Sequence, residues 1–208
     1  EIKSNFIKEY ESGFSTCDIA KKYNISTIPI NYELHKNNVK FRPGYINKRQ
    51  IECNHSYFCS IDTEEKAYWI GIIASDGCVM DDNAILYGVA SKDWEHPFKF
   101  RDALKSDHKI SVRLNNGSGV YKICIRSLEM ANDIRKTGIC ARKSLILEDI
   151  SVPNHLKKHM YRGFFDGDGF IAYYEYRNSW MIGLSAPRIF LENFRIFLHV
   201  NNIDIQNK

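Results

Sequence analysis

The sequence predicts an α+β protein in which a unit of helix followed by β-hairpin occurs twice, behind a small helical module. Two matching segments carry the repeat, WIGIIASDG at 69–77 and YRGFFDGDG at 161–169. Each ends a stretch with helical apolar spacing and is followed by a short run typical of β-strands. Because an internal repeat dictates architecture, this pair predicts two related structural units.

Composition indicates a folded, water-soluble chain. The 208 residues are 44% hydrophobic, which is ordinary for one or two globular domains. With no run of about eighteen apolar residues and no basic, apolar leader, we expect an intracellular protein with no membrane partner. The six cysteines lack a closely spaced pair and are expected to be reduced; Cys53, His55 and Cys59 form at most an incomplete zinc set.

Positive charge is unevenly distributed. The net charge is only +4, but the stretches 36–49 and 135–162 are each rich in lysine and arginine and poor in acids. Local positive charge is what phosphate binding requires, although a solvated protein face has the same composition.

Residues 1–40 are expected to form three short helices. Gly13 ends the first, Ser15 can cap the second, and Ser26 can cap the third after a tight turn. The region resembles the helix-turn-helix modules of resolvases and homeodomain-like proteins, and a generic three-helix bundle is the alternative. That resemblance implies a DNA-facing helix carrying Ser26, Thr27, Asn31, Tyr32 and His35.

Residues 41–61 lose periodicity and are expected to form a basic linker. Arg42, Lys48 and Arg49 in it could follow a phosphate backbone, or the segment could be a plain tether.

Residues 62–150 form the first predicted repeat, which reads helix, hairpin, helix, hairpin, helix. Its first helix is expected to begin with a capping box of Asp62 and Glu65 and to stop at Gly77. An Asn116-Gly117 turn predicts the second hairpin. Residues 151–208 then repeat helix, hairpin and helix, with the hairpin turning at 177–178.

Glycine inside the two repeated helices needs a physical reason, because it costs about 1 kcal/mol relative to alanine there. Close packing of one helix on the other supplies that reason. The expected contact face consists of small residues: Gly71, Ala74, Gly163 and Gly167.

Asp76 and Asp168 end the two helices, 92 residues apart. A carboxylate at a helix C-terminus opposes the helix dipole, and bringing two together adds repulsion. A divalent cation with hard oxygen ligands relieves both penalties and suits phosphodiester hydrolysis. An Asp-Gly pair that merely ends a helix is the alternative, which two matched copies make a poor explanation.

The phrases IDTEEKAYWIGIIASDGCV and YRGFFDGDGFI resemble the motifs of single-chain LAGLIDADG homing endonucleases, over about residues 62–208. The resemblance implies a pseudo-twofold pair of αββαββα repeats. It also implies an Mg²⁺ or Mn²⁺ site formed by Asp76, Gly77, Asp168 and Gly169, and a monomer that cuts both strands of a long asymmetric DNA target.

Further candidates follow from this resemblance and from strand alternation. Lys143 lies in a segment similar to the one that places a lysine near the metals in the family, so we expect it to assist catalysis. His108, Arg113, Lys122 and Arg126 are expected to contact the DNA groove, with plain surface polarity as the alternative.

The sequence departs from the family pattern in two ways. The sixth motif position is Ala74 in the first copy and Asp166 in the second. Only forty residues follow Asp168, so we expect a truncated second repeat, from a fragment or a shortened gene product. A non-cutting DNA-binding regulator and an RNA-binding intron maturase remain alternative functions on the same fold.

Overall fold

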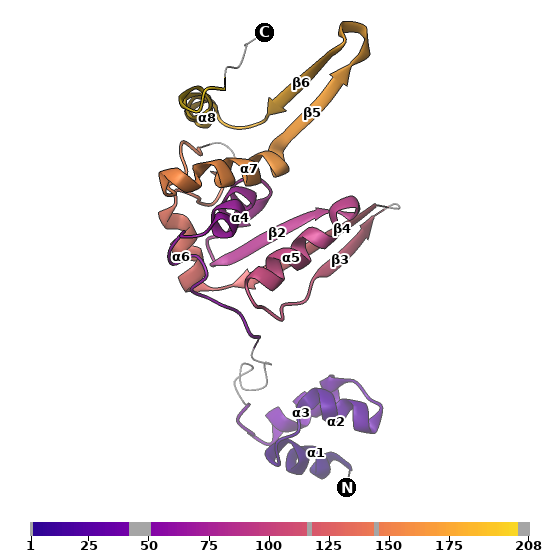
Figure 1. Ribbon diagram of the computed structural model, residues 1–208. Coiled ribbons are helices and arrows are strands. Elements are labelled where there is room, and N and C mark those ends of the chain that lie inside the picture. Colours follow the sequence, from indigo (N-terminus) through magenta and orange to yellow (C-terminus); the bar gives the residue numbers. More distant parts are fainter. Residues whose placement is uncertain (1, 42–50, 116–117, 144–145, 204–208) are drawn as a thin grey trace. The chain divides into compact units, whose positions relative to one another are not determined.

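The computed structural model describes residues 2–41, 51–115, 118–143 and 146–203. The chain divides into two compact units, Glu1–Gln50 and Ile51–Lys208. Figure 1 shows helices alone in the first unit and a mixture of helices and antiparallel strands in the second, so the α+β class is confirmed. Within the described ranges, no helix has both the length and the apolar character needed to cross a membrane.

The first unit consists of helices α1 (Ile2–Glu11), α2 (Thr16–Tyr23) and α3 (Thr27–Lys36). Ser15 forms a capping box with Asp18 at the start of α2, and Asn24 ends that helix in the left-handed conformation. Ser26 occupies the N-cap position of α3, but its side chain makes no capping hydrogen bond, contrary to the prediction. The three helices enclose their own apolar core: Phe6, Tyr10, Ile19, Ala20, Ile30 and Leu34.

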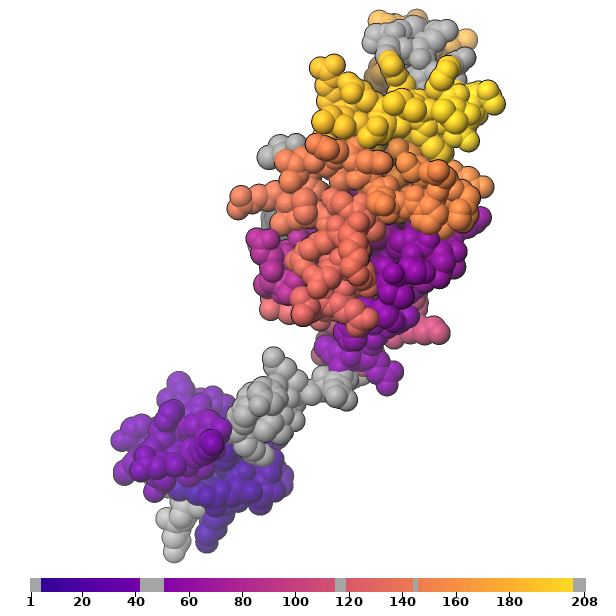
Figure 2. All heavy atoms as spheres, turned by 90° about the vertical axis from the view of Figure 1, so that its left-hand side faces the viewer, coloured from indigo at the N-terminus to yellow at the C-terminus, as the bar shows by residue number. Residues whose placement is uncertain are grey.

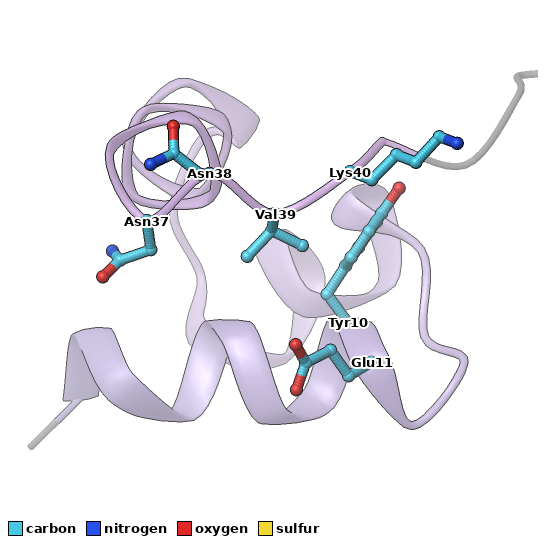
Figure 3. Close-up of a pocket in the computed structure, with 6 residues that line it drawn as sticks. All are labelled: Tyr10, Glu11, Asn37, Asn38, Val39 and Lys40. Atoms are coloured by element: carbon cyan, nitrogen blue, oxygen red, sulfur yellow. The ribbon is translucent and has the colours of Figure 1, made fainter.

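A hollow of about 450 Å³ lies in the first unit, between the end of α1 and the chain that leaves α3 (Figure 3). Tyr10 and Glu11 line it from α1, and residues 37–40 line it from the other side. It contains neither of the aspartates predicted to bind metal, because both belong to the second unit.

The first helix of the second unit is α4 (Glu64–Ser75), followed by strands β1 (Gly77–Val79) and β2 (Ala84–Ala90) and helix α5 (Glu95–Ala103). Strands β3 (Ser111–Asn115) and β4 (Ser118–Arg126) and helix α6 (Leu128–Lys136) complete this part. The pattern then recurs as α7 (Lys157–Asp168), β5 (Gly169–Tyr174), β6 (Ser179–Leu184) and α8 (Arg188–Val200).

The larger sheet is antiparallel, in the order β1-β2-β4-β3. On β4 the burial alternates: Ile123 and Ile125 are fully buried, whereas Lys122, Cys124 and Arg126 are exposed. Helix α5 lies along the sheet in Figure 1 and contributes Phe100 to the buried side. One face of the sheet therefore closes the core, and the opposite face meets solvent.

Two boundaries differ from the sequence prediction. Helix α4 is capped by Thr63, whose hydroxyl accepts from the Lys66 backbone N–H at 3.2 Å, and not by a box of Asp62 and Glu65. The segment 51–61, expected to be linker, belongs to the second unit, where Tyr57 and Phe58 are buried in the core. Aromatic burial thus outweighs the loss of sequence periodicity there.

The hairpin of β5 and β6 forms a separate two-stranded sheet among the described residues. Its turn contains Asn178 in the left-handed conformation, close to the predicted position. Several large apolar side chains on it are exposed: Ile171, Tyr173, Trp180 and Ile182.

Candidate active site

Helices α4 and α7 pack directly on each other through the repeated glycines. A Cβ added to Gly71 would clash with the Met160 carbonyl oxygen and lie 2.7 Å from the Phe164 backbone nitrogen. A Cβ on Gly163 would in turn clash with the Tyr68 carbonyl oxygen. Backbone therefore meets backbone at this crossing, which only glycine permits. Figure 2 shows the two chain segments adjoining on one face of the second unit.

The two helices run in the same direction, because their contacts advance in step. Tyr68 meets Gly163 near one end, and Ser75 meets Gly167 near the other. A Cβ on Gly167 would also lie 3.2 Å from the Asp76 carboxylate. The two C-termini, and with them Asp76 and Asp168, are consequently brought together at one end of the helix pair.

A hollow of about 330 Å³ opens beside this end. Asp168 borders it from α7, and Ala74, which is buried, borders it from α4. The remaining wall combines polar and apolar side chains: Ser75, Leu147, Phe164, Ser185, Ala186 and Pro187. A carboxylate at the edge of such a hollow is accessible to a small polar ligand.

The electrostatic environment disfavours two ionised carboxylates. Partial burial raises the pKa of Asp76, the charge of Asp168 raises it further, and Lys143 opposes both effects. Burial likewise raises the pKa of Asp168, again opposed by Lys143. Asp76 is exposed to solvent, which screens its charge, so the destabilisation that it causes is modest.

Lys143 belongs to the segment after α6, and its buried side chain reaches the C-terminal end of α4. Its ammonium donates to the Ser75 carbonyl at 3.0 Å and to the Gly77 carbonyl at 2.6 Å. Burial lowers the pKa of Lys143, whereas nearby acidic groups, among them Asp168 and Asp76, raise it. The lysine therefore places positive charge where the negative helix end and both carboxylates gather.

The donor atoms at this end fit a hard divalent cation. The two carboxylates supply oxygen ligands of the type that Mg²⁺ prefers, and water and phosphate oxygens commonly complete its octahedral shell. The Gly77 carbonyl already accepts from Lys143, and the Asp168 carbonyl accepts from the Ser185 backbone N–H at 3.1 Å. Gly169 follows α7 as its C-cap and has no side chain, so the two carboxylates are the side chains that could hold a cation here.

Across the described part of the chain, no three or more His, Cys, Asp or Glu side chains gather to hold a metal ion. Asp76 and Asp168 are only two such side chains, and the predicted zinc set of Cys53, His55 and Cys59 does not form such a group either. All six cysteines are free thiols.

Three of the four residues predicted to contact the DNA groove lie on the solvent face of the larger sheet. Arg113 is opposite Val120 in the register, so it shares that face with Lys122 and Arg126 on β4. Arg126 is paired with Asp82 at 3.0 Å. His108 is the exception: it precedes β3, is partly buried, and contacts the Ser106 hydroxyl at 2.6 Å.

The residues predicted on the DNA-facing helix occupy one side of α3. Tyr32 and His35 are exposed, as is Ser26 before the helix, while Thr27 and Asn31 are half-buried. Ile28, 75% exposed, extends this row and was missed, although it lies one helical turn before Tyr32. Arg42, Lys48 and Arg49, and the turn at 116–117, lie outside the described residues.

No protein-family model matches the chain, and the curated proteins contain no significant match to it. Function is therefore inferred from the residues and their geometry.

Proposed function

We propose that this protein is a metal-dependent, site-specific endonuclease for double-stranded DNA, of the LAGLIDADG homing type. The observation that carries the proposal is the pair of aspartates at adjacent C-termini of two glycine-packed helices, with the Lys143 ammonium beside them. A structural turn does not require two like charges at the ends of matched helices, whereas a bound cation explains them.

Asp76 and Asp168 would hold Mg²⁺ or Mn²⁺ between them. The bound cation would supply Lewis-acid chemistry, activating water and stabilising the leaving oxygen of the phosphodiester. Each aspartate comes from one repeat, so each is suited to serve one strand of the duplex. The hollow beside Asp168 provides room for water and phosphate oxygens.

Lys143 would act as an electrostatic and positioning group. Its ammonium is anchored on two carbonyls at the end of α4, so its charge is fixed before any substrate arrives. A preorganised cation at this place favours the negative charge that develops on the phosphate during hydrolysis.

Two surfaces of the protein would bind DNA. The solvent face of the larger sheet presents Arg113, Lys122 and Arg126, whose side chains suit contacts to phosphates and guanine in a major groove. Helix α3 of the first unit presents Tyr32 and His35 in the manner of a helix-turn-helix reader. A monomer with two different reading units fits a long asymmetric target.

The test is cleavage of a supercoiled plasmid library with randomised inserts, in Mg²⁺ or Mn²⁺, with end sequencing of the linear products. We expect the wild-type chain to produce recurrent breaks, and Asp76→Asn with Asp168→Asn to abolish them while DNA binding persists. Asp81→Asn, an exposed acid outside the site, is the matched control and should cleave normally.

Other outcomes identify the alternatives. Cleavage by the doubly substituted chain at the wild-type rate would refute the assignment of the aspartates. Sequence-specific DNA binding without metal-dependent cleavage would indicate a regulator. Preferential retention of intron RNA over insertion-site DNA on filters would indicate a maturase.

A further inference from the structure

A chain of polar contacts links strand β2 with helices α5, α4 and α7, and its first member, Tyr87, is paired in the strand register with Gly77, the residue after Asp76. Tyr87 on β2 contacts Nδ1 of His96 through its hydroxyl. His96 Nε2 lies 2.9 Å from the Tyr68 hydroxyl, which donates to the Asp166 carboxylate at 2.9 Å. Four side chains from four elements thus form one continuous series.

The direction of each hydrogen bond in the series follows from valence. The carboxylate of Asp166 accepts, so the single hydroxyl hydrogen of Tyr68 is committed to it. The Tyr68 oxygen must then accept from His96, which requires a hydrogen on Nε2. Nδ1 is left as the acceptor for Tyr87. The burial that lowers the pKa of His96 is consistent with this neutral Nε2–H form.

The contact between Gly71 and Gly163 does not fix the rotation of α7 about its axis, and this series of hydrogen bonds can fix it. Gly71 and Gly163 bring the helices close, but they offer no side chains that interlock and fix the rotation of α7 about its axis. Asp166 is on α7, two residues before Asp168. The hydrogen bond from Tyr68 to Asp166 therefore sets the orientation of the Asp168 side chain at the end of α7.

The hydrogen bond to Asp166 constrains the helix of the second repeat and has no counterpart in the first. The position that matches Asp166 in α4 is Ala74, which has no carboxylate to offer. Tyr68, by contrast, is held from two sides, since the Arg162 guanidinium lies 4.8 Å from the centre of its ring. No local sequence pattern connects residues on α4, α5 and α7, so the sequence alone does not predict the contact between His96 and Tyr68.

We propose that His96 is a positioning residue: through its Nε2–H it orients Tyr68, whose hydroxyl fixes Asp166 and thereby the presentation of Asp168. The proposal deepens the proposed nuclease function and rests on it for its effect on DNA cleavage. Its structural part concerns the folded chain alone and can be measured without DNA.

Two substitutions test the roles of the two ring nitrogens of His96 independently. His96→Gln places an amide NH₂ near the position of Nε2 and keeps the donor to Tyr68. His96→Asn places its amide near Nδ1 and keeps only the contact with Tyr87. Both replace a half-buried ring by a smaller amide, so each is the matched control for the other.

The deciding measurement is a double-mutant cycle of Tyr68→Phe and Asp166→Asn, followed by urea unfolding, in three backgrounds. We expect the wild-type and His96→Gln chains to show non-additivity of about fivefold in the unfolding equilibrium constant, and His96→Asn to show none. Equal coupling in both variants, or additivity in the wild type, would overturn the proposal.

Plasmid cleavage supplies the functional readout. We expect His96→Asn, but not His96→Gln, to accumulate nicked over linear product, because only the Asp168 half of the site is displaced. If the wild type cleaves and both variants give its nicked-to-linear ratio, the inference fails while the nuclease assignment stands. If the wild type cleaves no DNA, the proposed function fails and the coupling measurement alone decides whether His96 orients Tyr68 and Asp166.

Discussion

Replacing Gly71 by alanine probes the contact on which the site depends. The new Cβ would overlap the Met160 carbonyl oxygen and approach the Phe164 nitrogen to 2.7 Å, and both of these are backbone atoms of α7. Backbone cannot rotate away as a side-chain end can, so α4 and α7 must move apart along their length.

The expected loss of stability is the difference between two effects. Overpacking of a tight contact lowers stability by roughly 1–3 kcal/mol or more. We expect a loss at the upper end of this range, because separating the helices also loosens the packing of the buried Ile72 and Phe164 side chains. Helix propensity favours alanine over glycine by about 1 kcal/mol. We therefore expect a net loss of about 2 kcal/mol and impaired DNA cleavage, because Asp76 and Asp168 separate.

Urea unfolding followed by tryptophan fluorescence measures this loss. All three tryptophans belong to the second unit, and Trp69 is buried on α4 itself, so the signal excludes the first unit. Lys158→Ala on the exposed surface of α7 is the control and should change stability by less than about 0.5 kcal/mol. If Gly71→Ala instead raised stability by about 1 kcal/mol, the helix-propensity difference between alanine and glycine, the close backbone contact between α4 and α7 would be refuted.

Three further predictions concern charge and exposure. Asp76→Asn should stabilise the chain at pH 7 by about 0.5–1 kcal/mol, since it removes a carboxylate from a negative helix end that solvent only partly screens. Folding raises the pKa of the Asp76 carboxyl, so the gain in stability should vanish as the pH falls to 3.8, the ordinary pKa of an aspartate. A gain in stability that grows in acid would contradict this. Lys143→Met should destabilise by roughly 1–3 kcal/mol in urea, because the Ser75 and Gly77 carbonyls lose a charged donor, and unchanged stability would count against that anchoring. Tyr32→Ala, at an exposed position, should leave stability within about 0.5 kcal/mol yet weaken binding of duplex DNA several-fold in fluorescence anisotropy; undiminished binding would remove α3 from the DNA interface.

Local sequence determined much of the secondary structure. Gly77 and Gly169 follow the ends of α4 and α7, Ser15 caps α2, and the left-handed Asn178 lies in the turn between β5 and β6. These features depend on residues within a few positions of each other, which is why pattern alone could predict them. The prediction of Asp62 as a cap was wrong because the adjacent residues Asp62 and Thr63 are both favourable N-cap residues, and the structure uses Thr63.

Tertiary structure decided how distant residues meet. The repeat in the sequence indicated that Gly71 and Gly163 pack together, because a matched, costly glycine pair needs a shared partner. It could not show that Lys143 reaches the Ser75 and Gly77 carbonyls, that His108 lies off the sheet, or that His96 joins Tyr87 to Tyr68. Those contacts depend on the relative placement of whole elements, which the packing of the core sets and no local pattern encodes.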